Sequence, residues 1–463
     1  MHFEHDTYIS PFTWRYGSDD MRRVFSEIHK RRLLRRVWIA LAKAENKAGL
    51  VSDEQIAELE EHKDDVDIER ALEIERDIKH DLMAEIKVYA EQCPKASAII
   101  HLGATSMDIL DNMDVIRQKE ALDIIIDKVK KLLKVFLHLL EKYKAVPAMA
   151  FTHLQPAEIT TVGYRLSQTA QDLSDDLENL LFLRNSLKGK GLKGAVGTAA
   201  SYTELLEDTD ISAFDLEEIF LNELGINAFD ATTQVYPRKQ DLRLIEALSG
   251  LCCTLHKFAA DFRIMQSPPI GEWAEPFGEH QVGSSAMPFK RNPINSEKID
   301  SLTRLVSSYY QVAWQNSALM FLERTLDDSA NRRIYIPEAF LATDECLKTI
   351  INVVGGMKIF QDGRLMENYG IFSSSEKLLM CLVKNGADRQ KMHEIIREDS
   401  LKAWSEIQHG RKNNLKTLLT EDPQLLKYMT QDEIEKCLDA SLYIGDAVMR
   451  TELVIARVKK LTE

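Results

Sequence analysis

The chain has 463 residues, which exceeds the size of one compact core, so two or three domains are expected. Its 44% hydrophobic and 29% charged content is that of an ordinary soluble globular protein, and its formal net charge of −14 argues against non-specific binding to nucleic acid. An anionic ligand must therefore be attracted by a local cationic pocket.

The amino terminus has no basic segment followed by an apolar one, so no signal peptide is expected. No uncharged apolar run is long enough to span a bilayer. The six cysteines form no CxxC pair and no spacing typical of metal ligands. These features predict a cytoplasmic protein with reduced, mostly buried thiols and no membrane partner.

Residues 1–105 are expected to form an N-terminal domain of shorter, charged helices. Arg15-Tyr16, in a segment rich in Trp and Phe, could donate to a phosphate, but the pair alone indicates little. On a helix, Lys79-His80-Asp81 could not share one face, because consecutive helical residues point in different directions. A solvated charged surface is then the simpler interpretation of these three residues.

Thr105 and Asp108, in His101-Leu-Gly-Ala-Thr-Ser-Met-Asp108, have the spacing of a capping box that opens a helix. One interpretation is that the motif serves only as this helix cap. Alternatively, the hydroxyls of Thr105 and Ser106 could bind a carboxylate beside the backbone amides of a helix start.

Apolar residues at alternating spacings of three and four predict a central domain, residues 106–360, with five long amphipathic helices packed as a bundle. The first is expected from about Asp114 to Lys144. Three further stripes cover 166–180, 245–262 and 299–313. A fifth helix is expected to start at Pro337 and to stop near Gly355-Gly356.

The first long helix carries a second apolar stripe. It consists of Ile124, Ile126, Leu133, Leu137 and Leu140. A helix that is apolar over a wide arc is buried on most sides, and five helices of one chain can hardly cover it. The pattern favours a bundle that continues across a homo-oligomer; a large interface with another domain is the alternative.

Little strand is expected. Short ribbons are possible at 193–202 and 230–236. Shorter helices return in a C-terminal domain, residues 361–463, with breaks at Asn385-Gly386 and Asp422-Pro423. The predicted fold class is therefore all-α, with three domains.

Three polar motifs accompany the long helices. His153, in Thr152-His153-Leu-Gln-Pro156, lies in a turn between two long helices and is a candidate acid–base group, although an isolated histidine can be purely structural. Arg324, Ser329 and Arg333, in the segment 323–333, could grip a phosphate through planar guanidinium groups. The alternative is salt bridging to Asp327 and Asp328.

Residues 283–293 read Gly-Ser-Ser-Ala-Met-Pro-Phe-Lys-Arg-Asn-Pro. A hinge glycine, two hydroxyls, two cations and an amide suit a mobile loop that closes on an anion. Asn292-Pro293 reads as the N-cap and first residue of the next helix, and a helix start with adjacent cations is an anion site. The alternative is a solvated loop that ends in a capped helix.

In this order, these motifs resemble the fumarase/aspartase superfamily, whose signature is Gly-Ser-Ser-x-Met-Pro-x-Lys-x-Asn-Pro. Ala286 and Lys290-Arg291 are similar to the adenylosuccinate lyase family. Fumarase and aspartase usually have Ile then Lys-Val, and argininosuccinate lyase usually has Ile then Lys-Lys. The stretches His101-Leu-Gly-Ala-Thr-Ser, Phe151-Thr-His-Leu-Gln-Pro-Ala and 323–333 resemble the branch that includes the animal enzymes.

The resemblance implies an all-α subunit whose central helices assemble into a homotetramer, with each active site shared among three subunits. It implies β-elimination of fumarate from adenylosuccinate, giving AMP, and from succinylaminoimidazole-carboxamide ribotide (SAICAR), giving AICAR. No metal or organic cofactor is implied. Another fumarate-releasing lyase, such as argininosuccinate lyase, and a helical scaffold without activity are the alternatives.

The resemblance also implies roles for individual residues. Ser284 matches the general base, which the residues alone do not distinguish from Ser285, and His153 matches the general acid. Lys298 stands where relatives often carry Arg, and a lysine lacks the bidentate fork. The other substrate-binding matches are Arg15, Tyr16, Lys79, His80, Asp81, Thr105, Ser106, Gln234, Lys290, Asn292, Arg324, Ser329 and Arg333.

Overall fold

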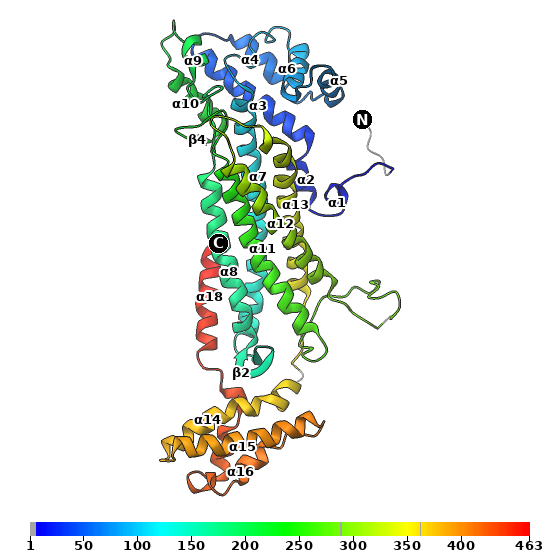
Figure 1. The fold of residues 1–463 in the computed structure, drawn as a ribbon, viewed down its shortest axis with the longest axis vertical. Coiled ribbons are helices and arrows are strands. Elements are labelled where there is room, and N and C mark those ends of the chain that lie inside the picture. Colours follow the sequence, from blue (N-terminus) through cyan, green and yellow to red (C-terminus); the bar gives the residue numbers. More distant parts are fainter. Residues whose placement is uncertain (1–5, 288, 362) are drawn as a thin grey trace. The chain divides into compact units, whose positions relative to one another are not determined.

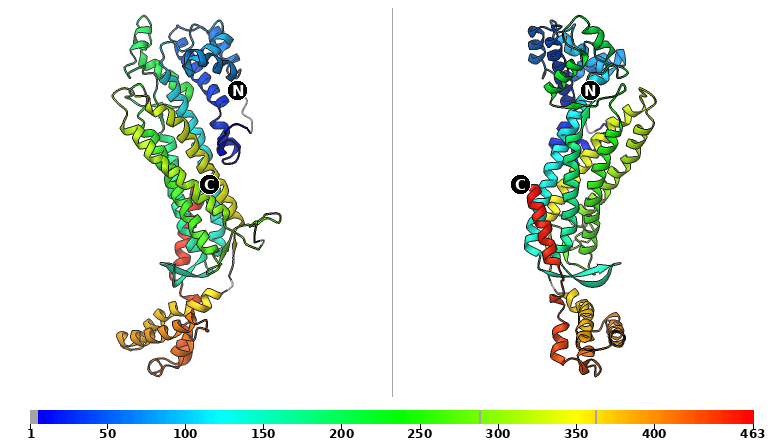
Figure 2. Two further views of the ribbon diagram at one scale, coloured as in Figure 1. Left: turned by 45° about the vertical axis from the view of Figure 1, so that its right-hand side comes forward. Right: turned by 90° about the vertical axis from the view of Figure 1, so that its left-hand side faces the viewer.

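A computed structural model of the chain describes residues 6–287, 289–361 and 363–463 (Figures 1 and 2). The chain is mostly helical, which confirms the all-α prediction. Contacts divide it into two units: Met1–Val129, Asp176–Lys257 and Glu297–Ile350 form the first, and Lys130–Asp175, Phe258–Ser296 and Ile351–Glu463 form the second. The division into three domains remains a prediction.

Five long helices cover the apolar stripes, but the first begins at Ser106 and not near Asp114 as predicted. They are α7 (Ser106–Tyr143), α8 (Val162–Ser186), α11 (Lys239–Gln266), α12 (Ile294–Ala318) and α13 (Asp327–Gly356). Their parts in the first unit lie side by side (Figure 1). Gln118 of α7 donates to Asp241 of α11 at 3.3 Å, and the amides of Asn316 and Asn331 join α12 to α13.

The predicted start of the fifth helix at Pro337 is wrong. Helix α13 begins at Asp327 and carries Pro337 in its interior. Proline leaves the carbonyl of Arg333, one turn earlier, without its usual N–H donor. Asp327 and Asp328 in the first turn favour the earlier start because they complement the helix dipole.

The second apolar stripe of α7 is largely covered within the chain. Ile126 is 5% exposed, and Leu133 and Leu140 are fully buried. The argument that this stripe requires other subunits is therefore wrong, because the chain's own elements bury most of it.

The remaining helices of the first unit are α3, which has 21 residues, and seven shorter ones among the described residues. They are α1 (Pro11–Trp14), α2 (Asp19–Val24), α3 (Glu27–Lys47), α4 (Asp53–Glu61), α5 (Ile68–Ile78), α6 (Asp81–Gln92), α9 (Ala200–Leu205) and α10 (Ala213–Leu224). Strands β3 (Lys188–Gly189) and β4 (Asn227–Ala228) pair in parallel. The ribbons predicted at 193–202 and 230–236 are wrong. Residues 193–199 form turns and bends with Gly194 and Gly197 at positive φ, 200–202 begin α9, and 230–236 are irregular.

The second unit contains the β1 (Pro147–Thr152) and β2 (Gln155–Thr161) hairpin, and the short strands β5 (Trp273–Ala274) and β6 (Lys358–Ile359). Its C-terminal elements are η1 (Met366–Gly370), α14 (Ile371–Lys384), α15 (Arg389–Gln408), α16 (Leu415–Glu421), η2 (Leu425–Lys427), α17 (Gln431–Cys437), η3 (Ala440–Leu442) and α18 (Ala447–Thr462). Both helix breaks predicted after residue 361 are confirmed. Helix α18 lies beside α8 (Figure 2), where Arg457 pairs with Asp175 at 2.6 Å.

The core of the first unit is built on α3, whose Trp38 and Leu41 are almost fully buried. The same helix buries Glu45 completely, and neither of its carboxyl oxygens has a hydrogen-bond partner among the described residues. Burial raises the pKa of Glu45 to about 9. Within the described part of the chain, no helix has the length and apolar character needed to cross a membrane.

Candidate active site

A cavity of about 630 Å³ lies in the first unit and gathers nine of the predicted site residues. They are Lys79, His80, Asp81, Thr105, Ser106, Gln234, Arg324, Ser329 and Arg333. They come from four separate stretches of sequence, so the fold brings together motifs that are far apart along the chain.

Lys79, His80 and Asp81 reach the cavity because they do not lie on one helix. Lys79 caps the end of α5 with a left-handed φ of 57°, His80 is the N-cap of α6, and Asp81 is its first residue. The sharp turn between two helices places all three side chains on one wall. The assumption that the three residues lie on a single helix is therefore wrong, although Lys79 and His80 are exposed to solvent.

The side chain of Asp108 holds the Thr105-Ser106 turn in place. Its carboxylate accepts from the backbone N–H of Thr105 at 3.0 Å, which is one half of the predicted capping box. It also accepts from Nζ of Lys190 at 2.5 Å, and both side chains are fully buried. Burial lowers the pKa of Lys190, and Asp108 opposes this shift. The buried pair thus holds the start of α7 at the cavity.

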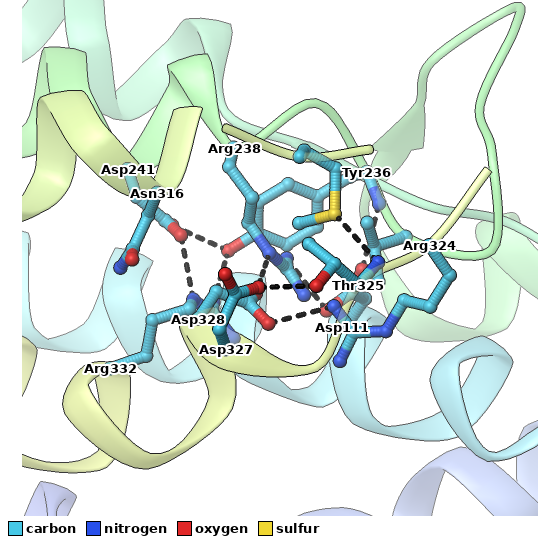
Figure 3. A network of polar contacts seen from close by, with 12 residues as sticks. Asp111, Tyr236, Arg238, Asp241, Asn316, Arg324, Thr325, Asp327, Asp328 and Arg332 are labelled. Carbon is cyan, nitrogen blue, oxygen red and sulfur yellow. Dashed lines mark hydrogen bonds and ion pairs between the residues drawn. The ribbon is translucent and has the colours of Figure 1, made fainter. Parts of the chain in front are cut away.

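The arginines of the cavity belong to a network of ion pairs (Figure 3). Arg324 and Arg238 donate to opposite oxygens of Asp328, each at 2.7 Å, and Arg238 also donates to Asp111 at 3.0 Å. Arg332 donates to Asp241 at 2.7 Å. The predicted salt bridge to Asp328 therefore forms, while Arg324 still lines the cavity.

Arg333 donates to Asp81 at 2.8 Å. Although burial opposes it, the Arg333 guanidinium lowers the pKa of Asp81. No sequence motif predicted several further charged residues on the cavity wall, among them Lys30, Arg117 and Arg238. Burial lowers the pKa of Lys30, while the neighbouring Glu27 opposes this shift. The lining carries seven Lys and Arg side chains against four Asp and Glu, so the lining is cationic in an acidic protein. Asp111, Asp241 and Asp328, which are outside the lining, pair with three of its arginines.

Three other predicted residues of the first unit are absent from this lining. Arg15 is exposed and stacks beside Trp14 and Tyr16. Lys298 donates to the buried Glu345 at 2.8 Å, and the second oxygen of Glu345 accepts from the backbone N–H of Gly17 at 3.1 Å. Lys298 therefore supports the segment that carries Arg15 and Tyr16.

In the second unit, His153 lies at the tip of the β1–β2 hairpin. Thr152 pairs with Gln155, so His153 and Leu154 are the two turn residues, with φ of 53° and 60°. Two positive φ values are typical of a type I′ turn, which favours Asn-Gly, so this sequence holds strain at an exposed tip. The predicted turn is confirmed, but the strands around it were missed because the polar β2 sequence has no clear alternation.

Residues 283–287 and 289–292 contact one another. Ser284 Oγ accepts from the backbone N–H groups of Ala286 at 3.3 Å and Met287 at 3.1 Å. A Cβ on Gly283 would lie 2.2 Å from the carbonyl oxygen of Lys290, so only glycine permits this close approach. Asn292 Nδ2 donates to the carbonyl of Gly283 at 3.3 Å. Pro288 of the predicted motif lies outside the described residues.

Two backbone N–H groups at the start of the following helix are already taken by a side chain of the protein. Helix α12 begins at Ile294, one residue later than predicted. The backbone N–H groups of Asn295 and Ser296 in its first turn already donate to the carboxylate of Glu275. The chain therefore supplies its own anion, which sequence spacing could not reveal because Glu275 lies 20 residues before Asn295.

The model of the lyase family matches residues 11–307, and that of the adenylosuccinate lyase C-terminus matches residues 372–454. The chain is 39% identical to the adenylosuccinate lyase of Schistosoma mansoni over 98% of this chain and 95% of that protein. The adenylosuccinate lyases of Schizosaccharomyces pombe and Saccharomyces cerevisiae are 36% and 35% identical over 97% and 98% of this chain, and over 94% and 95% of their own lengths.

The chain belongs to the adenylosuccinate lyase family. Solved structures agree with the fold. The 3-carboxy-cis,cis-muconate lactonizing enzyme of Pseudomonas putida matches with a TM-score of 0.85 at 21% identity, covering 98% of this chain and 99% of that chain. A fumarate lyase from Mesorhizobium sp. matches at 0.83 and 20%, covering 97% and 99%. At such identity these structures show the fold alone, and the family rests on the sequence matches.

Proposed function

We propose that this protein releases fumarate from adenylosuccinate, giving AMP, and from SAICAR, giving AICAR. The observation that carries the proposal is the cationic cavity of the first unit in a member of the adenylosuccinate lyase family. Both substrates combine a ribose phosphate with a succinyl-amino group, so one site accommodates both.

Arg324, Ser329 and Arg333 are proposed to bind the phosphate. Planar guanidinium groups suit a phosphate because two N–H donors can contact two oxygens at once. The pairs to Asp328 and Asp81 hold both arginines in place before a ligand arrives. Thr105, Ser106 and Gln234 are proposed to contact the succinyl group.

In the proposed reaction, Ser284 removes a proton from the succinyl Cβ. The electron pair left on that carbon moves into the adjacent carboxylate, whose growing charge Lys290 and Asn292 are proposed to stabilise. One such donor contributes about 3 kcal/mol. The pair then returns to form the double bond of fumarate while the C–N bond breaks, and His153 protonates the departing nitrogen.

The geometry of the loop supports Ser284 as the base. Its oxygen accepts from two backbone N–H groups, and donors to an oxygen favour its anionic form. A serine hydroxyl is a poor base in water, so such donors are needed for the role.

We further propose a homotetramer with sites shared among three subunits. Several large apolar side chains of α12, α13 and the segment between them are exposed in the isolated chain: Trp314, Leu319, Phe321, Leu322 and Ile334. Exposed apolar surface of this kind marks a protein interface. A cytoplasmic location is part of the same proposal.

Purified protein should release fumarate from adenylosuccinate and SAICAR but not from argininosuccinate. The change in ultraviolet absorbance on fumarate formation measures each reaction. Ser284→Ala and His153→Ala should each lose nearly all turnover while the oligomer, measured by light scattering, stays intact. Turnover of argininosuccinate would favour argininosuccinate lyase as the function. Inactivity of the pure oligomer on all three substrates would favour a helical scaffold without activity. Full activity of Ser284→Ala would exclude Ser284 as the base.

A further inference from the structure

The loop that carries Ser284 is fixed at both ends by two side chains outside it. Glu275 directly follows β5 and is 8% exposed. Its carboxylate accepts four hydrogen bonds from the first turn of α12. Asn295 donates from its backbone N at 3.2 Å and from Nδ2 at 2.9 Å, and Ser296 donates from its backbone N and from Oγ at 2.7 Å each.

Gln266, the last residue of α11, links the same two ends of the loop. Its Oε1 accepts from the backbone N–H of Glu275 at 2.9 Å, and its Nε2 donates to the carbonyl of Arg291 at 3.0 Å. The strand before Glu275 is itself tied down, because β5 pairs with β6 and the N–H of Phe360 donates to the carbonyl of Glu272 at 2.8 Å. The entry and exit of the loop are thus joined by one side-chain amide.

These contacts are strong for identifiable reasons. The first N–H groups of a helix have no partner within the helix, and a carboxylate at that end interacts favourably with the helix dipole. A buried carboxylate needs donors to replace water, and Glu275 has four.

We propose that Glu275 is a positioning residue for the reaction. Together with Gln266 it fixes the distance and orientation between the two ends of the loop, and therefore the frame from which Ser284 and Lys290 reach the substrate. The proposal rests on the function proposed for Ser284. Displacing a reacting group by about 1 Å can reduce the rate roughly 100-fold, while groups that only bind the substrate are unaffected.

The test is Glu275→Gln, which keeps the shape of the side chain but replaces one acceptor oxygen by an NH2 group that faces other donors. We expect kcat for adenylosuccinate to fall roughly 10- to 100-fold with KM changed less than about threefold. Amide hydrogen exchange at Asn295 and Ser296 should accelerate. Gln266→Met, at a less buried position, should show the same split with a smaller loss and guards against misfolding of the first variant.

Glu279→Gln is the matched control, because it removes the same charge from an exposed position in the same loop, and it should behave as wild type. Unchanged kcat in both Glu275→Gln and Gln266→Met would overturn the proposal. A fall in kcat matched by an equal rise in KM, together with a lower melting temperature, would also overturn it. If wild type released no fumarate, the proposed function would fail. The exchange rates would still decide whether Glu275 orders the loop, and unchanged exchange would refute that too.

Discussion

The isolated carboxyl of Glu45 predicts an unusual dependence of stability on pH. Burial without a partner raises its pKa from 4.5 to about 9, so folding at neutral pH requires the ionised carboxylate of the unfolded chain to take up a proton. The folded pKa lies above the unfolded value. The stability that this group contributes is therefore fully present below pH 4.5 and is lost as the pH rises towards 9.

The magnitude follows from the two pKa values. Each pH unit between them costs about 1.4 kcal/mol, so at pH 7 the protonation of Glu45 costs roughly 3 kcal/mol. Glu45→Gln and Glu45→Met remove the titration. The free energy of unfolding of either variant minus that of wild type should thus rise by about 1.4 kcal/mol per pH unit from pH 5 to pH 8.

The assay is urea unfolding at pH 5, 6, 7 and 8, at one protein concentration. The offsets of the two variants will differ, because a buried amide also needs partners whereas a methionine does not. Their slopes against wild type should agree, because both lack the same titrating group. A difference that does not change with pH would refute the reasoning, since it would mean that Glu45 keeps its charge in the folded protein.

Three further outcomes are expected. Arg324→Lys should raise KM for adenylosuccinate about tenfold, or about 1.4 kcal/mol, with little change in kcat. Lysine lacks the forked guanidinium group that can contact both Asp328 and a phosphate, and an effect on kcat alone would contradict this. Gly283→Ala should lower kcat at least tenfold, because its Cβ would displace the carbonyl of Lys290, and wild-type kinetics would show that the loop tolerates the shift. Leu154→Gly should raise the free energy of unfolding by up to about 1 kcal/mol and Leu154→Val should lower it, because glycine adopts the left-handed backbone without the strain of a bulky or β-branched residue. Calorimetry of the two variants measures the sign.

The sequence predicted the long helices because their apolar spacing repeats over many turns. It placed the start of α13 wrongly, since a proline usually marks a first turn and here lies inside the helix. The β1–β2 hairpin was missed because its second strand is polar. Local patterns predict an element well only when the element buries one regular face.

The candidate residues of the cavity could be proposed from motifs, but not their supports. Lys190 supports the cavity, and Glu275 supports the loop of Ser284, through contacts with residues far along the chain that no local spacing predicts. Adjacency in sequence does not predict that Lys79, His80 and Asp81 line one cavity, because a turn between α5 and α6 separates them from a single helix. Only the fold shows which charges are paired and which remain available to a ligand.

The shared carboxylate of Asp328 has an evolutionary consequence. Arg238 is held between Asp111 and Asp328, and Arg324 shares Asp328 with it. Replacing one acid would leave a buried cation without its partner, whereas replacing an acid and its arginine together would reduce the stability less. Neutral evolution of this ion-pair network must therefore proceed by paired replacements. Related proteins should keep these residues or exchange them as sets rather than one at a time.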